Sequence, residues 1–140
     1  MNFERFSSLV VRTMADAVIY ADAKGQIHFW NGGAERIFGF TEAEAVGQSL
    51  DIIIPESLRA RHWNGFNNTM RTGEMHYQAG ALLSVPSVRK DGARISVEFT
   101  VVPIHSEAGE MVGIAAVMRD VTKQFDEMRA LRKLIPSSRG

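Results

Sequence analysis

The sequence predicts an α+β domain built on an antiparallel sheet. Strand-like segments form two groups, at residues 17–31 and 81–122, and helical segments occupy the interval between them. Strands gathered at both ends of a domain favour an antiparallel sheet over alternating strand–helix units. The length of 140 residues and the hydrophobic fraction of 45% fit one globular domain with a single core.

The N-terminal segment predicts a helix followed by a hairpin. Residues 2–14 predict an amphipathic helix, because apolar side chains recur on one helical face: Phe3, Phe6, Val10 and Met14. The following stretch, AVIYADAKGQIHFWN, contains two strand-like runs around the turn AKGQ, where Gly25 supplies a permissive backbone. Two short helices are then expected, because Asn31 can cap NGGAERIFGF and Thr41 has capping-box spacing to Glu44 in TEAEAVG, which Gly47 closes.

After the brief apolar stretch DIII, residues 55–70 (PESLRARHWNGFNNTM) predict a longer helix that ends near Gly73 and has Pro55 in its first turn. Positions four apart lie on one face of such a helix. His62 occupies one position of an otherwise apolar series: Ile54, Leu58, Phe66 and Met70. The spacing therefore predicts that the imidazole points with its neighbours toward the sheet.

The C-terminal half predicts three strands and a final helix. Three runs rich in Val, Ile and Phe are separated by KDG and SEAGE, and Pro86 and Pro103 indicate edges, bulges or strand ends. The segment DVTKQFDEMRALRKLI has helical apolar spacing, at Val121, Phe125, Met128, Leu131 and Ile135. The last residues, PSSRG, are expected to be disordered.

Composition excludes several function classes. Sixteen basic residues balance sixteen acidic ones, so no net charge attracts nucleic acid or an anionic membrane. The absence of cysteine excludes disulfides, thiolate zinc sites, cysteine nucleophiles and cysteinyl chromophores. No apolar run reaches membrane-spanning length and MNFERFSS does not resemble a signal peptide, so a cytoplasmic location is expected. No phosphate loop, paired-histidine metalloprotease motif or serine elbow is present, so the chain is not expected to be an enzyme.

Three motifs carry a family resemblance: WNGGAERIFGFTEAEAVGQSL, RKDGARISVEFTVVPI and GIAAVMRDVT. In this order they resemble the PAS-domain signature over residues 8–122. The resemblance implies a five-stranded antiparallel sheet with short helices across one face and a ligand-sized pocket between them. It also implies the domain organisation: an N-terminal amphipathic helix at 1–14, a PAS sensor domain at 15–122, and a C-terminal signalling helix with a disordered tail at 123–140.

The segment IPESLRARHWNGF resembles the pocket helix of haem-binding PAS domains of the rhizobial oxygen-sensing kinase type. This resemblance implies that His62 ligates the iron of a b-type haem and that His76 lies near the haem propionates. An imidazole on an apolar face is independently suited to this role, because neutral nitrogen binds iron while apolar flanks cover the porphyrin. The expected cofactor-binding residues are His62, His76, Leu58, Phe66, Leu82, Leu83, Ile114 and Met118.

One position departs from the oxygen-sensing relatives. Where they carry an arginine that hydrogen-bonds oxygen, this chain reads GALLSVP, and the equivalent residue is Leu82 or Leu83. Leucine cannot donate a hydrogen bond to bound dioxygen, so carbon monoxide, nitric oxide or a redox change is the more natural signal. Three methionines are candidate sixth ligands or core filler: Met75, Met111 and Met118.

Other interpretations remain open at the level of sequence. His62 can instead hydrogen-bond a backbone carbonyl in the core or lie at the surface, and the chain would then be a cofactor-free PAS dimerisation or interaction module. A flavin-binding redox PAS domain, holding FAD, is a third alternative, although the missing cysteine excludes flavin photochemistry of the cysteine-adduct type. Trp30 and Trp63 can line a cofactor or simply pack, and Arg59 and Arg61 can reach propionates or stay solvated. The apolar faces of residues 2–14 and 122–135 predict a homodimer, and the output partner is not identified.

Overall fold

The computed structural model describes residues 1–75 and 80–135 of the chain and confirms the predicted α+β class. The strands are β1 (Ala17–Asp22), β2 (Ile27–Trp30), β3 (Leu83–Val88), β4 (Arg94–His105) and β5 (Met111–Asp120). They form one antiparallel sheet in the order β2-β1-β5-β4-β3. The helices are α1 (Phe3–Thr13), α2 (Gly32–Phe38), α3 (Glu42–Ala45), α4 (Arg59–Thr72) and α5 (Thr122–Leu134), with 3-10 turns η1 (Leu50–Ile53) and η2 (Glu56–Leu58).

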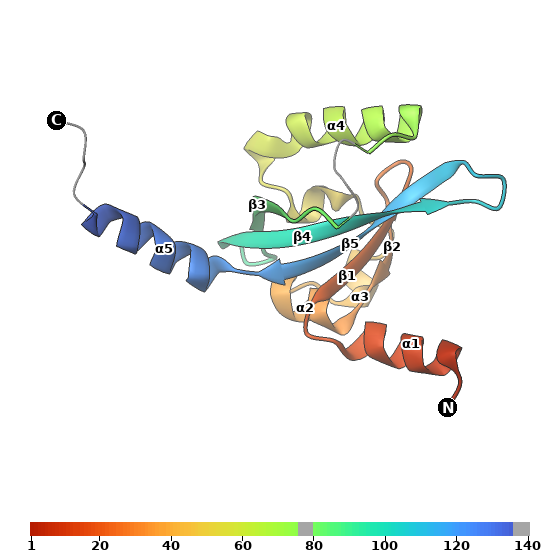
Figure 1. Cartoon of the computed structure of the whole chain (residues 1–140), viewed down its shortest axis with the longest axis horizontal. Coiled ribbons are helices and arrows are strands. Elements are labelled where there is room, and N and C mark those ends of the chain that lie inside the picture. Colours follow the sequence, from red (N-terminus) through yellow and green to blue (C-terminus); the bar gives the residue numbers. More distant parts are fainter. Residues whose placement is uncertain (76–79, 136–140) are drawn as a thin grey trace.

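One face of the sheet carries most of the core. Cross-strand partners lie on the same face, so the pairs of β1 with β5 and of β5 with β4, together with the alternation along β4, define an inner face that includes Ala17, Ile19, Ala21, Ile95, Val97, Phe99, Ile114, Ala116 and Met118. Phe66 of α4 and Leu50 and Ile53 of η1 belong to the same buried cluster as this face. In Figure 1, α4 runs along one side of the strands, α1 lies on the other side, and α5 extends away from the sheet.

Asn31 joins three elements at the start of the domain. Its side-chain oxygen accepts from the backbone N–H groups of Val18 (2.8 Å) and Ala34 (2.9 Å), and its amide donates to the carbonyls of Val11 (2.7 Å) and Asp16 (3.0 Å). The predicted cap of α2 is therefore confirmed, and the same residue also anchors α1 and β1. The predicted capping box of Thr41 and Glu44 at α3 is confirmed as well.

The predicted start of the long helix was wrong. Pro55 does not lie in its first turn: the backbone there is extended, η2 follows, and α4 begins only at Arg59. The Arg59 side chain donates to the carbonyls of Ile54 (3.1 Å) and Asp51 (3.2 Å), which stabilises this separate turn. Ile54 and Leu58 thus precede α4 rather than sharing its face. The predicted end is confirmed, because Gly73 adopts the left-handed conformation that closes the helix (φ 72°).

The two terminal helices are open to solvent. Neither α1 nor α5 contains a buried residue, and large apolar side chains stay exposed on both: Phe3, Phe6, Leu9 and Val10 on α1, and Phe125, Met128, Leu131 and Leu134 on α5. The tail at 136–140, predicted to be disordered, lies outside the described residues. Among the helices that the structure describes, none has both the length and the hydropathy required to cross a membrane.

Candidate functional site

One side of α4 faces the core cluster of the sheet. Phe66 is buried, with 6% of its surface exposed, and Trp63 and Met70 pack against the same cluster. His62 is partly buried and lies one helical turn before Phe66. The opposite side of the helix is polar and exposed, at Arg61, Asn64 and Asn67. His62 therefore lies on the side of α4 that faces the sheet.

His62 forms a cluster of rings with Trp63 and Phe66. The imidazole and indole centroids are 4.6 Å apart with their planes at 80°, and the indole and phenyl centroids are 5.2 Å apart at 79°. The imidazole and phenyl centroids are 5.7 Å apart at 31°. Edge-to-face pairs of this kind are favourable because the positive ring edge meets the negative face of its neighbour. Two aromatic neighbours thus give the imidazole an apolar setting.

The electrostatics of His62 favour a neutral ring. Its Nδ1 is buried and has no hydrogen-bond partner among residues 1–75 and 80–135. Burial lowers the pKa of His62 below the ordinary 6.5, and the negative charge of Asp51 opposes this shift in part. A neutral imidazole with an unused nitrogen is chemically suited to ligate a transition metal.

The donor set around His62 suits a metal held in a porphyrin better than a bare metal ion. Within the described ranges, no group of three or more His, Cys, Asp or Glu side chains is arranged to hold a metal. A porphyrin supplies four of the iron ligands itself, so a single protein nitrogen is sufficient for haem. The Nδ1 of His62, which has no partner in the part of the chain that the structure describes, and its apolar neighbours therefore fit a haem.

The sheet presents apolar side chains on the face toward α4. Leu83 pairs with Phe99, and Phe99 pairs with Met118, so all three share the inner face. Met118 is buried, whereas Phe99 and Ile114 remain partly exposed although they pack against the core cluster. Leu82 precedes β3 and is 63% exposed. Of the two leucines that the sequence left open, Leu83 is the one on the inner face.

The other candidate residues are distributed over the fold. Leu58 is partly buried in η2, immediately before α4, and His76 lies outside the described residues. Trp30 is buried in the core and its Nε1 donates to the carbonyl of Phe40 (2.9 Å), so it packs. Met111 pairs with His105 at the far end of β5, and His105 is exposed as expected.

Sequence reasoning missed two partners of Trp63. Asp51, in the stretch taken as merely apolar, accepts a hydrogen bond from Trp63 Nε1 (2.7 Å). Gly25, taken as a turn residue, lies directly under the indole ring. The carboxylate of Asp51 in the otherwise apolar stretch DIII was a sequence signal that this residue has a specific partner. No sequence pattern indicated the contact between Gly25 and Trp63.

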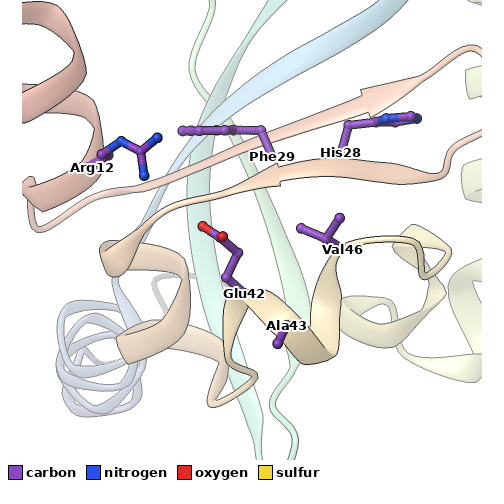
Figure 2. A pocket seen from close by; sticks show the side chains of 6 residues that line it. All are labelled: Arg12, His28, Phe29, Glu42, Ala43 and Val46. Carbon is purple, nitrogen blue, oxygen red and sulfur yellow. The ribbon is translucent and has the colours of Figure 1, made fainter. Parts of the chain in front are cut away.

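A pocket of about 390 Å³ lies elsewhere, between α1, β2 and α3. Figure 2 shows Arg12 of α1 and Glu42 of α3 directed toward the ring of Phe29 on β2. Val46 and Ala43 complete the α3 side, and His28 of β2 lines the pocket with its ring directed away from Phe29. Of the expected cofactor-binding residues that the structure describes, none lines this pocket.

Comparison with known proteins places the whole architecture in one family. The family described as "PAS fold" matches residues 5–121. The chain is similar to the sensor protein FixL of Bradyrhizobium diazoefficiens, with 32% identity over 89% of this chain and 24% of that protein. It is also similar to the oxygen sensor protein DosP of Escherichia coli, with 25% identity over 93% of this chain and 16% of that protein. The chain thus spans about a quarter or less of the length of these two relatives.

Solved structures support the fold alone. An RNA-binding light-oxygen-voltage receptor superposes with a TM-score of 0.77 and 19% identity, covering 94% of this chain and 37% of that one. Similar architecture at such low identity carries no information on the ligand, because one scaffold hosts many functions.

Proposed function

The chain belongs to the PAS family, and from this premise we propose that it is a sensory domain that binds b-type haem through His62. The observation that carries the proposal is the buried Nδ1 of His62, on the helix side that faces the sheet, which has no hydrogen-bond partner among the described residues. The similarity to two sensor proteins, one of them named an oxygen sensor, supports the same assignment.

His62 would hold the iron, and the inner face would cover the porphyrin. Phe66 stacks beside the imidazole, and Leu83, Phe99 and Ile114 offer apolar surface that is not fully buried. Burying such surface against a porphyrin is favourable, at roughly 25 cal/mol for each Å² removed from water. The bound haem would supply an iron that takes a gas ligand or changes oxidation state.

The nature of the signal follows from the side chains opposite α4. Leu83, Phe99, Ile114 and Met118 share the inner face, and none of these four can donate a hydrogen bond to a polar ligand. Dioxygen is the gas that gains most from such a donor. We therefore propose carbon monoxide, nitric oxide or a redox change as the signal, rather than oxygen.

The output would pass through the flanking helices of a homodimer. The exposed apolar side chains of α1 and α5 provide surface for pairing with a second copy. A ligand that binds one arrangement of these helices better than another shifts their equilibrium. No catalytic role is proposed for the chain itself.

An absorption spectrum of the protein with haem supplied tests the proposal, in the oxidised and reduced states. We expect a stoichiometric Soret band in the wild type that is lost or shifted in His62→Ala. His105→Ala, which removes an exposed histidine, is the matched control and should leave the band unchanged. Full haem occupancy with unaltered iron coordination in His62→Ala would refute the assignment.

The second candidate is a cofactor-free dimerisation or interaction module. The exposed apolar surfaces of α1 and α5 favour it as much as they favour the sensor. In that case supplied haem gives no stoichiometric band, and His62→Ala changes stability only. FAD binding, the weaker alternative, would make the purified protein yellow and fluorescent.

A further inference from the structure

We propose that Trp63 is a positioning residue that fixes the imidazole of His62, and that Asp51 and Gly25 hold the indole in place. The inference rests on the proposed role of His62 as iron ligand. It goes beyond that role because it assigns a function to three residues that do not themselves touch the iron.

The first contact joins Trp63 to His62 directly. The two ring centroids are 4.6 Å apart and the planes are close to perpendicular, at 80°. Neighbouring side chains on a helix do not normally face each other, because successive residues are rotated by 100°. The contact therefore requires that Trp63 be held toward His62 by something other than the helix.

Asp51 provides the first of these restraints. Its Oδ1 accepts a hydrogen bond of 2.7 Å from Trp63 Nε1, across twelve residues of sequence. The carbonyl of Asp51 also accepts from Arg59 Nη2 (3.2 Å), so the turn that presents the carboxylate is tied to the start of α4. A hydrogen bond to a charged acceptor is stronger than a neutral one and fixes the plane of the indole.

Gly25 provides the second restraint, from the turn between β1 and β2. A Cβ placed on Gly25 would lie 2.1 Å from Trp63 Cη2 and 2.3 Å from Cζ3. The six-membered ring of the indole thus rests on the glycine backbone, in space that any side chain would occupy. Gly25 also has a positive φ of 79°, which glycine adopts readily.

The indole is consequently held between η1 and the hairpin turn, with its plane close to perpendicular to that of the imidazole. A ligand ring whose orientation is fixed before the cofactor arrives need not be ordered on binding. We expect these two restraints on the indole to slow haem loss about tenfold relative to a protein without them. One charge-assisted hydrogen bond and one aromatic pair are sufficient for an effect of this size.

The test compares two glycine-to-alanine variants with the same backbone strain. Gly25→Ala drives a methyl group into the indole, whereas Gly92→Ala imposes a similar positive φ (85°) with no atom within 4 Å of the new Cβ. Two readouts are used: the ¹H–¹³C NMR signals of the His62 ring in the haem-free protein at pH 8, and the rate of haem transfer from the loaded protein to an excess of apomyoglobin. Thermal melting of both variants measures the loss of stability that alanine causes at a positive φ, which the two variants have in common.

Further variants keep the test informative if Gly25→Ala does not fold. Trp63→Leu removes the indole without adding atoms to the turn. Asp51→Asn keeps an oxygen that can accept from Nε1, whereas Asp51→Ala keeps none, so the asparagine should restore most of what the alanine loses.

The proposal is supported if Gly25→Ala and Asp51→Ala move the His62 signals and if these two variants and Trp63→Leu speed haem transfer about tenfold, while Gly92→Ala and Asp51→Asn stay near wild type in both readouts. Equal behaviour of Gly25→Ala and Gly92→Ala, or haem transfer at the wild-type rate in Trp63→Leu, would overturn it. Because the NMR readout needs no haem, the proposal of haem binding and the proposal of a positioning role for Trp63 can be refuted independently. A wild type that binds no haem refutes the haem sensor, and shifted His62 signals in Gly25→Ala and Asp51→Ala would still support the positioning role.

Discussion

Replacement of Asn31 by alanine should strongly destabilise the domain, because one amide serves four hydrogen bonds. Asn31 is 3% exposed, and its partners are the N–H groups of Val18 and Ala34 and the carbonyls of Val11 and Asp16. A net hydrogen bond is worth about 1 kcal/mol, and each polar group left unsatisfied and buried costs about 1–3 kcal/mol. Relaxation and entering water recover part of this sum, so we expect a loss of about 3 kcal/mol in the free energy of unfolding.

Urea denaturation of the haem-free protein, followed by circular dichroism, measures this loss. Asn67→Ala on the exposed side of α4 is the control, and it should change stability by no more than about 0.5 kcal/mol because alanine is the better helix former. Asn31→Asp keeps the acceptor for Val18 and Ala34 but directs a carboxylate oxygen at two carbonyls, so it should be no more stable than the alanine variant. A loss below about 1 kcal/mol in Asn31→Ala would refute the idea that this amide joins α1, β1 and α2.

Three further predictions concern the site. The pKa of His62 is lowered in the folded haem-free protein, so the unfolded chain takes up a proton first as the pH falls below 6.5. The free energy of unfolding therefore declines with falling pH until the folded pKa is passed, with a slope of at most about 1.4 kcal/mol per pH unit. His62→Phe should remove this decline, as measured by urea titrations between pH 7.5 and 5. Phe66→Ala should lower the free energy of unfolding by about 3 kcal/mol, since Phe66 is buried in the core cluster of the sheet, and a loss under about 1 kcal/mol would contradict that packing. Leu83→Arg should introduce a hydrogen-bond donor on the inner face and slow oxygen dissociation from the reduced haem protein in flash photolysis, whereas Leu82→Arg, on an exposed residue, should not.

Local chemistry made much of the fold predictable from sequence. The cap at Asn31, the capping box of Thr41 and Glu44, and the glycine that ends α4 depend on residues within a few positions of each other. The start of α4 was not predictable in this way, because Arg59 draws the preceding turn into a separate element through bonds to Ile54 and Asp51.

The surroundings of His62 required the three-dimensional structure. Helical spacing predicted that His62 shares a face with Phe66, and the two rings lie together. The spacing could not indicate that Trp63 reaches Asp51 or that Gly25, 38 residues before it, lies beneath the indole. The choice between Leu82 and Leu83 depended on the pairing of β3 with β4, since a shift of one residue exchanges the faces of a strand.

The unequal lengths of β3 and β4 have a consequence for handling the protein at high concentration. β3 covers β4 only up to Phe99, so Thr100–His105 runs on toward the β4–β5 turn with one side unpaired by β3. An unpaired strand edge of this kind can pair with the same strand of another molecule and initiate the formation of a fibril. Pro103 lies within this stretch and has no N–H to offer an incoming strand. We therefore expect Pro103 to hinder self-association through this edge of the sheet, so that its replacement favours precipitation before it weakens the fold.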